Sequence, residues 1–160
     1  MKTSFMAALA AAAVATAAPA RADQSCKPVV GSFEAHIVTD GCESPVGLCT
    51  AGRVWGGIQG NYAFTAANLV PTFAVSPAAS VPSIFFFTGH SDVTLKDGGH
   101  ALGIDTGTID LPSIPGGQGG FASLITFRGP VAGQIRLRGE VDLVAGTTSG
   151  DYLGTTCTAQ

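Results

Sequence analysis

The chain has 160 residues, of which 46% are hydrophobic and only 12% are charged, and its formal net charge at pH 7 is −3. A chain this apolar is expected to fold rather than to stay disordered, and its length fits one ordinary domain. The acidic balance argues against a nucleic-acid binder, because a polyphosphate would be repelled. The 22 glycines do not recur at every third residue, which excludes a collagen-like chain.

Residues 1–22 have the features of a cleavable signal peptide. Lys2 gives a short positive start, residues 5–18 are uncharged and rich in alanine, and Ala20-Arg21-Ala22 fits the small-x-small rule for signal peptidase. The uncharged stretch has about 14 residues, fewer than the roughly 20 that a membrane-spanning helix needs. We therefore expect cleavage near Ala22, a secreted or periplasmic product without a membrane span, and one mature domain over residues 23–160.

Four cysteines follow this leader: Cys26, Cys42, Cys49 and Cys157. An even number of cysteines in an oxidising compartment predicts two disulfides, for which three pairings are possible. We favour a short loop closed by Cys42 and Cys49, and a bond between Cys26 and Cys157 that joins the two ends of the mature chain. The spacings show neither close cysteine pairs nor interleaved histidines, so no metal site is expected at the cysteines.

The rest of the chain is typical of β-structure. Its longest stretch without glycine or proline is residues 61–70, which is shorter than an average helix of about 11 residues. Apolar and polar residues alternate instead, as they do in half-buried strands. Seven or eight strands are predicted, around residues 32–37 and over 55–66, 84–96, 100–111, 121–127, 133–144 and 149–157.

These strands predict an all-β fold, a single small antiparallel β-barrel of about eight strands. A long meander with few charges has to protect its edge strands, and closure into a barrel removes the edges. Glycines inside the strands, such as Gly103 and Gly107, fit the sharp bends of a small barrel. A two-sheet β-sandwich is the alternative.

The apolar face of the strands has two interpretations. An eight-stranded barrel is wide enough either to be filled by side chains or to hold one small ligand. In the second case, the candidate ligand-binding residues are Phe33, Ile37, Tyr62, Phe64, Phe87, Leu102, Ile104 and Leu137.

Glu34 and His36 are the candidate catalytic residues, because a carboxylate and an imidazole two residues apart share one face of a strand. The alternation imposes a choice at this strand. If Glu34 and His36 point into the barrel, then Phe33 and Ile37 point outward, and the reverse also holds.

A second polar group is expected on the hairpin that turns near residues 96–99. A two-residue turn at Asp97-Gly98 or at Gly98-Gly99 puts Asp105 on the same face as His90 and Asp92. A histidine with two carboxylates can bind a cation or transfer protons. The simpler interpretation is that this face is the solvated outside of the barrel.

The glycine pattern of the C-terminal half points to a known family. Residues 133–139 read G-x-I-x-L-x-G, and the spacing continues with Gly146, Gly150, Tyr152, Gly154 and Cys157. Together with segments 56–64 and 87–95, this pattern resembles small secreted bacterial proteins related to the allene oxide cyclase and dirigent barrels, over most of residues 31–157. The chain departs from the plant dirigents at residues 129–133, where it has Gly-Pro-Val-Ala-Gly in place of a Gly-Thr-Gly motif.

This resemblance implies an eight-stranded barrel with an apolar cavity, often assembled as a homotrimer. In the enzymes of the family the cavity shapes the ring closure or coupling of a reactive apolar intermediate, and the cyclases use a buried carboxylate, for which Glu34 is the nearest match by position. The expected function is therefore binding of an apolar small molecule in the lumen, without a cofactor, with cyclase-like or isomerase-like catalysis left open. The alternative is a non-enzymatic envelope or surface module with a filled barrel.

Overall fold

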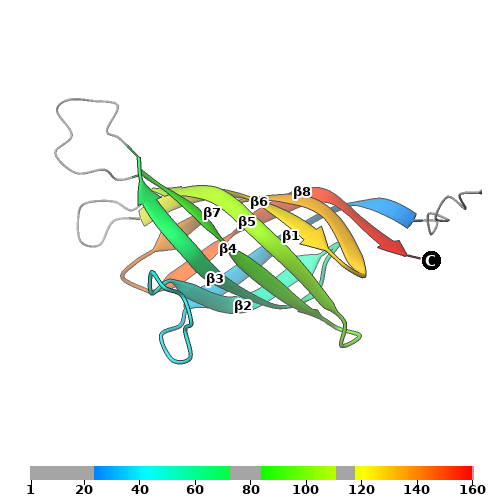
Figure 1. Cartoon of the computed structure of the whole chain (residues 1–160), viewed down its shortest axis with the longest axis horizontal. Helices are drawn as coiled ribbons and strands as arrows, with labels where there is room; N and C mark the ends of the chain where they lie inside the picture. Colours follow the sequence, from blue (N-terminus) through cyan, green and yellow to red (C-terminus); the bar gives the residue numbers. More distant parts are fainter. Residues whose placement is uncertain (1–23, 73–83, 111–117, 160) are drawn as a thin grey trace, which may run out of the picture.

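The computed structural model describes residues 24–72, 84–110 and 118–159, which form one closed barrel of eight antiparallel strands (Figure 1). Each strand pairs with the next, and β1 pairs with β8 to close the barrel. The strands are β1 (Gln24–Ile37), β2 (Cys49–Gly56), β3 (Gly60–Pro71), β4 (Ile84–Leu95), β5 (His100–Asp110), β6 (Gln118–Arg128), β7 (Val131–Asp142) and β8 (Thr147–Ala159). The predicted eight-stranded barrel is confirmed, and the sandwich is not. The expected signal peptide lies outside the described residues.

Several strand bounds differ from the sequence prediction, since β1 begins at Gln24 rather than near residue 32 and β2 begins at Cys49 rather than at residue 55. The segment 55–66, expected as a single strand, is divided between the end of β2 and the start of β3 by a short turn at residues 57–59. The alternation pattern does not reveal this turn, because Ile58 within it points into the barrel and is buried like a strand residue. The described residues contain no helix with the length and apolarity of a membrane span.

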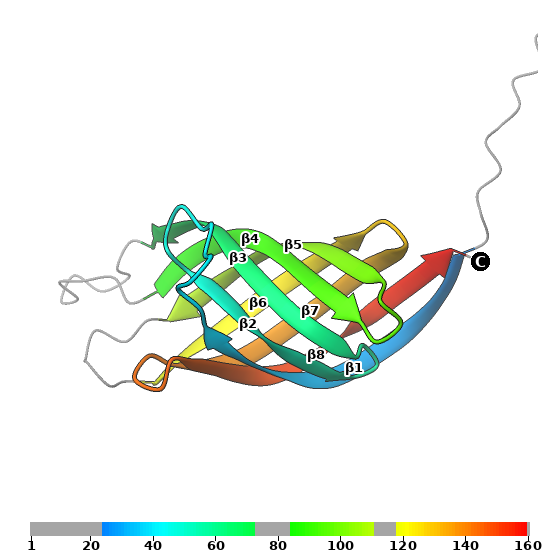
Figure 2. The same cartoon turned by 90° about the horizontal axis from the view of Figure 1, so that it is seen from below.

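The two ends of the barrel differ in their connections (Figure 2). At one end the strands are joined by the short turns 57–59, 96–99 and 129–130, beside the outer ends of β1 and β8. The opposite end carries the longer β1–β2 connection, residues 38–48, and the β7–β8 turn. We call these the closed end and the mouth end.

The apolar interior consists of two clusters, one in each half of the barrel. The cluster at the closed end is the larger, and its members include Val54, Ile125, Phe127, Ile135 and Tyr152. The cluster at the mouth end consists of Phe64, Ala66, Phe87, Ile109 and Val141. Because fewer large side chains point inward near the mouth, only the closed half is packed as a solid core.

Tyr152 closes the barrel beneath the β2–β3 turn. Its phenolic oxygen accepts a hydrogen bond from Ile58 N at 2.8 Å and donates to the Trp55 carbonyl oxygen at 2.8 Å. The ring passes directly over Gly31, where a Cβ atom would collide with it and with the Trp55 carbonyl. Because Gly31 has no side chain, Tyr152 of β8 can reach over it and hydrogen-bond to the turn that follows β2.

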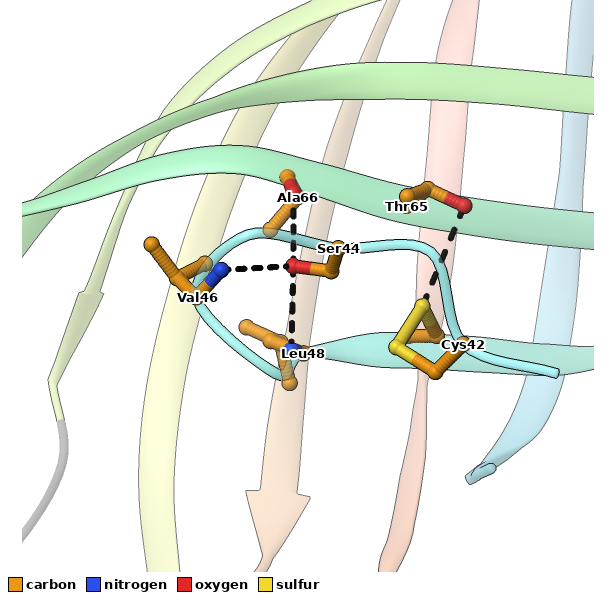
Figure 3. The surroundings of a disulfide bond; sticks show 7 residues. Cys42, Ser44, Val46, Leu48, Thr65 and Ala66 are labelled. Atoms are coloured by element: carbon orange, nitrogen blue, oxygen red, sulfur yellow. Dashed lines mark hydrogen bonds between the residues drawn. A yellow bond between two sulfur atoms is a disulfide. The ribbon is translucent and has the colours of Figure 1, made fainter. Parts of the chain in front are cut away.

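Both predicted disulfides are present. Cys26 is bonded to Cys157, its direct partner in the β1–β8 register, and Cys42 is bonded to Cys49. The first bond ties together the two strands that close the barrel. The second shapes the β1–β2 connection at the mouth end (Figure 3).

Candidate functional site

A cavity of about 270 Å³ occupies the mouth half of the lumen. Its wall is mainly aromatic and aliphatic, and it includes six of the eight residues expected to bind a ligand: Phe33, Ile37, Tyr62, Phe64, Phe87 and Leu137. Of the two alternatives for β1, the structure therefore shows the one in which Phe33 and Ile37 point inward. Further lining residues that the sequence did not single out for this role include Asp105, Ile109, Phe121, Ser123, Val141 and Thr148.

The floor of the cavity is formed by Phe33, Tyr62 and Leu137. These three residues also line a void of only about 20 Å³ on their other side, inside the closed half. The packed core of the closed half thus begins directly below the floor. The cavity is a blind pocket that is entered from the mouth end rather than a channel through the barrel.

Five aromatic rings surround the cavity in two groups. Phe33 stands edge-on to Phe121 with 5.8 Å between ring centroids, and its centroid lies 6.2 Å from that of Tyr62. Across the lumen, the Phe64 and Phe87 rings meet edge to face at 5.6 Å. Edge-to-face pairs are the favoured arrangement of packed aromatic rings, so the aromatic wall is fixed by contacts among its own members.

The β1–β2 connection forms one side of the mouth, where it contributes Val46 and Leu48 to the wall (Figure 3). Ser44 organises this segment, because its hydroxyl donates to the Ala66 carbonyl oxygen at 2.7 Å and accepts from the Leu48 amide at 3.1 Å. Together with the Cys42–Cys49 disulfide, these bonds fasten the connection to β3 and hold its apolar residues over the cavity.

Asp105 is the one charged side chain among the described residues that line the cavity. It is only 1% exposed, and its Oδ1 atom accepts a 3.4 Å hydrogen bond from the Ser123 hydroxyl. Its Oδ2 atom has no hydrogen-bond partner within the described part of the chain. Burial raises the pKa of Asp105 to about 6, against the opposing effects of Ser91, Ser123 and the charge of His90.

Tyr62 and Ser91 extend this polar spot along the floor. Their hydroxyl oxygens lie 3.4 Å apart in a hydrogen bond. Burial, reinforced by the negative charge of Asp105, raises the pKa of Tyr62, so its phenol stays protonated at physiological pH. Three hydroxyl groups and one carboxyl group therefore lie close together at the base of the pocket, whose remaining lining is apolar apart from Thr50 and Thr148.

The inward position of Asp105 corrects the sequence prediction, which placed it beside His90 and Asp92. The β4–β5 connection has three residues, 96–98, because Leu95 N donates to the Gly99 carbonyl oxygen at 2.8 Å and Gly98 adopts a positive φ of 83°. A three-residue loop of this kind is common in hairpins. Relative to the expected two-residue turn at Asp97-Gly98 it shifts the register by one residue, so Asp105 pairs with Gly89 and faces inward.

The same shift makes the prediction for Leu102 and Ile104 wrong. These residues alternate with Asp105 along β5, and they pair with Asp92 and His90 on the outer surface. Their side chains are 56% and 43% exposed. Neither residue lines the cavity.

Glu34 and His36 are outside the barrel, so the inward position on which their candidacy as catalytic residues depended is not found. They alternate with the buried residues Phe33 and Ala35, and both are exposed. They line a wide, open groove on the outer face together with Arg53 and other polar residues. The carboxylate inside the barrel is Asp105 of β5, not Glu34 of β1.

The hypothetical cation site is likewise divided between two faces. His90 and Asp92 point outward, away from Asp105, and Asp92 instead contacts His100, with 2.9 Å between Oδ1 and Nδ1. Within residues 24–72, 84–110 and 118–159, no three histidine, cysteine, aspartate or glutamate side chains are grouped closely enough to hold a metal ion.

Comparisons of the chain with protein-family models, with curated proteins and with solved structures gave no match.

Proposed function

We propose that the protein binds one compact, mainly apolar small molecule in the mouth half of its barrel. The observation that carries this proposal is the blind cavity of about 270 Å³ with its aromatic wall. Ligand pockets are usually apolar, concave and equipped with a few convergent polar groups, and those for drug-sized ligands start at about 300 Å³. A cavity near this lower limit suits a compact ligand of one to three rings.

The proposal extends to steering the cyclisation or coupling of such a molecule. The support for this step is the resemblance of the glycine pattern to the allene oxide cyclase and dirigent barrels, together with the closed floor of the pocket. A rigid pocket that orients a reactive intermediate and excludes water provides selectivity without many catalytic groups. Asp105 adds an acid or base with a pKa of about 6, which is suited to proton transfer near neutral pH.

The cavity weighs against the alternative of a non-enzymatic module with a filled barrel, because only the closed half has a packed core. We also propose that the protein works in the periplasm or outside the cell. Its two disulfides are compatible with an oxidising compartment. Assembly into a homotrimer stays a prediction from the resemblance.

A matched pair of substitutions tests whether the lumen is the binding site. Phe87 is buried in the cavity wall, whereas its neighbour Phe86 is 58% exposed on the outside. The neutral fluorescent probe N-phenyl-1-naphthylamine is titrated into the oxidised wild-type protein and into the Phe87→Trp and Phe86→Trp variants. The extra ring volume at position 87 fills part of the cavity, so we expect at least tenfold weaker probe binding there and less than a twofold change at position 86.

Circular dichroism and thermal unfolding show whether both variants are folded. Equal probe affinities in two folded variants, or no saturable binding to the wild type, would refute binding in the lumen. Saturation at about one probe per chain, lost only in Phe87→Trp, would support it.

A further inference from the structure

The cavity carries a negative charge without a positive partner. None of its described lining residues is lysine, arginine or histidine, and Asp105 is its only acidic one. The two chain segments between described strands, residues 73–83 and 111–117, contain no charged residue in their sequence. A cation that pairs with Asp105 inside the mouth half is therefore not supplied by either segment or by the described wall.

The free oxygen of Asp105 is a specific contact point for a ligand. Asp105 is only 1% exposed, and its Oδ2 atom is unpartnered among the described residues. Oδ1 accepts a hydrogen bond from Ser123, and the nearby Ser91 hydroxyl also favours the ionised carboxyl. A buried carboxylate without a counter-charge is costly, since it loses its hydration and receives little in return. A ligand that brings a positively charged donor to Oδ2 removes this cost.

The aromatic wall suits the same kind of ligand. Five rings, those of Phe33, Tyr62, Phe64, Phe87 and Phe121, line the pocket that contains Asp105. The face of an aromatic ring attracts a cation within about 6 Å of its centroid, and this attraction is larger where water is excluded. Rings combined with one carboxylate provide both the apolar contact and the charge that an organic cation requires.

From this geometry we propose that the cavity selects a compact organic ammonium ion, whose nitrogen binds Asp105 Oδ2 and whose apolar body lies among the aromatic rings. The inference rests on the proposed function, and it replaces an unspecified apolar ligand with an arylalkylamine-like one. Ser123 lies at the other carboxyl oxygen, with its hydroxyl 3.4 Å from Oδ1 and 3.5 Å from the Thr106 carbonyl oxygen.

The groups around Asp105 define how binding depends on pH. β4 contributes His90, which points outward but whose charge favours the ionised carboxyl, and β3 contributes the phenol of Tyr62. β6 presents Ser123 and Ile125, and β7 presents Leu137, none of which titrates. Asp105 is thus the one nearby group that changes from neutral to charged between pH 5 and pH 7.5 inside the cavity.

Ligands that share a phenylethyl body but differ in charge test the proposal. 2-Phenylethylamine, 2-phenylethanol and 3-phenylpropionate share one apolar body and carry an ammonium, a hydroxyl and a carboxylate group. Each competes with bound N-phenyl-1-naphthylamine at pH 7.5. We expect the amine to bind at least tenfold more tightly than the alcohol, as a charge-assisted hydrogen bond predicts, and the carboxylate to bind most weakly.

Two matched substitutions locate the charge. Asp105→Asn keeps the side-chain shape and removes the charge inside the cavity, whereas Asp92→Asn makes the same change on the outer surface. We expect Asp105→Asn to weaken amine binding at least tenfold and alcohol binding less than threefold, and Asp92→Asn to leave both unchanged. In the wild type, lowering the pH from 7.5 to 5 should weaken amine binding about tenfold, because a carboxyl with a pKa of about 6 is then mostly neutral.

Equal binding of amine and alcohol, with neither altered in Asp105→Asn, would overturn the ammonium proposal while leaving the lumen as a binding site. A failure of the probe itself to bind the wild type would overturn both proposals. Tight amine binding that survives in folded Asp105→Asn would also overturn the inference, because it would place the ammonium group elsewhere.

Discussion

Replacing Asp105 with asparagine should stabilise the protein, and the gain should grow with pH. The carboxyl is buried in an apolar pocket, and its folded-state pKa of about 6 lies above the ordinary value of 3.8. The folded protein therefore keeps this proton to a higher pH than the unfolded chain does. Between about pH 4 and pH 6 the folded state binds more protons, so the contribution of Asp105 to the free energy of unfolding falls as the pH rises through this window and levels off above it.

The size of the effect follows from the shift. A difference of roughly two pKa units corresponds to about 3 kcal/mol in full, at 1.36 kcal/mol for each unit. Roughly half of this is expected between pH 5 and pH 7.5, because part of the loss has already occurred below pH 5. The Asp105→Asn variant lacks the ionisation, so its unfolding free energy relative to the wild type should increase by about that amount over the same interval.

The assay is urea unfolding of the oxidised wild type, Asp105→Asn and Asp151→Asn at pH 5.0, 6.0 and 7.5, with disulfides intact throughout. Asp151 is exposed on β8, so its variant controls for the general effect of removing one negative charge. If the difference in unfolding free energy between Asp105→Asn and the wild type stays constant or shrinks as the pH rises, then Asp105 is not a desolvated carboxyl in the folded protein.

Two further predictions concern the closed end and the disulfides. Tyr152→Phe should lower the free energy of unfolding by about 1–3 kcal/mol, because it leaves the buried Ile58 amide without its partner; a loss below about 0.5 kcal/mol in urea unfolding would contradict that role. Removing the Cys26–Cys157 bond with a double alanine variant should lower the free energy of unfolding by up to about 5 kcal/mol, because this bond closes a loop of 131 residues. The same change at Cys42–Cys49, which closes a loop of 7 residues, should lower it by about 2.5 kcal/mol. Denaturant unfolding of the two variants measures this order, and the reverse order would contradict the loop-closure argument.

Much of the fold could be predicted from alternation and cysteine number. The pattern at residues 33–37 identified an inner and an outer face, and Phe64 and Phe87 were correctly expected to face the lumen. The number of disulfides followed from the even count of cysteines, and the pairing observed is the one favoured among the three possible. These features depend on local periodicity or on chain ends, which a sequence shows directly.

The polar centre of the cavity could not be predicted in the same way. Whether Asp105 faces inward depends on one residue in the length of the loop at 96–98, because that residue inverts every side chain of β5 relative to β4. Asp97-Gly98-Gly99 is compatible with several hairpin loops, and its sequence does not choose among them. A signal was present in the inward-facing glycines Gly89 and Gly103, whose side-chain positions are filled by Phe64 and Ile125.

The central claim is that a ligand binds inside the mouth half of the barrel, and an NMR titration tests it most directly. The uniformly ¹⁵N-labelled, oxidised protein is titrated with 2-phenylethanol, a neutral ligand that does not depend on the charge of Asp105. Saturable shifts of the backbone amides at Phe64, Phe87 and Val141, with little change at Val54 and Ile135 in the closed half, are the expected result. Saturable shifts confined to residues of the outer face, such as Leu102 and Ile104, or no shifts at all in the folded protein, would contradict the account.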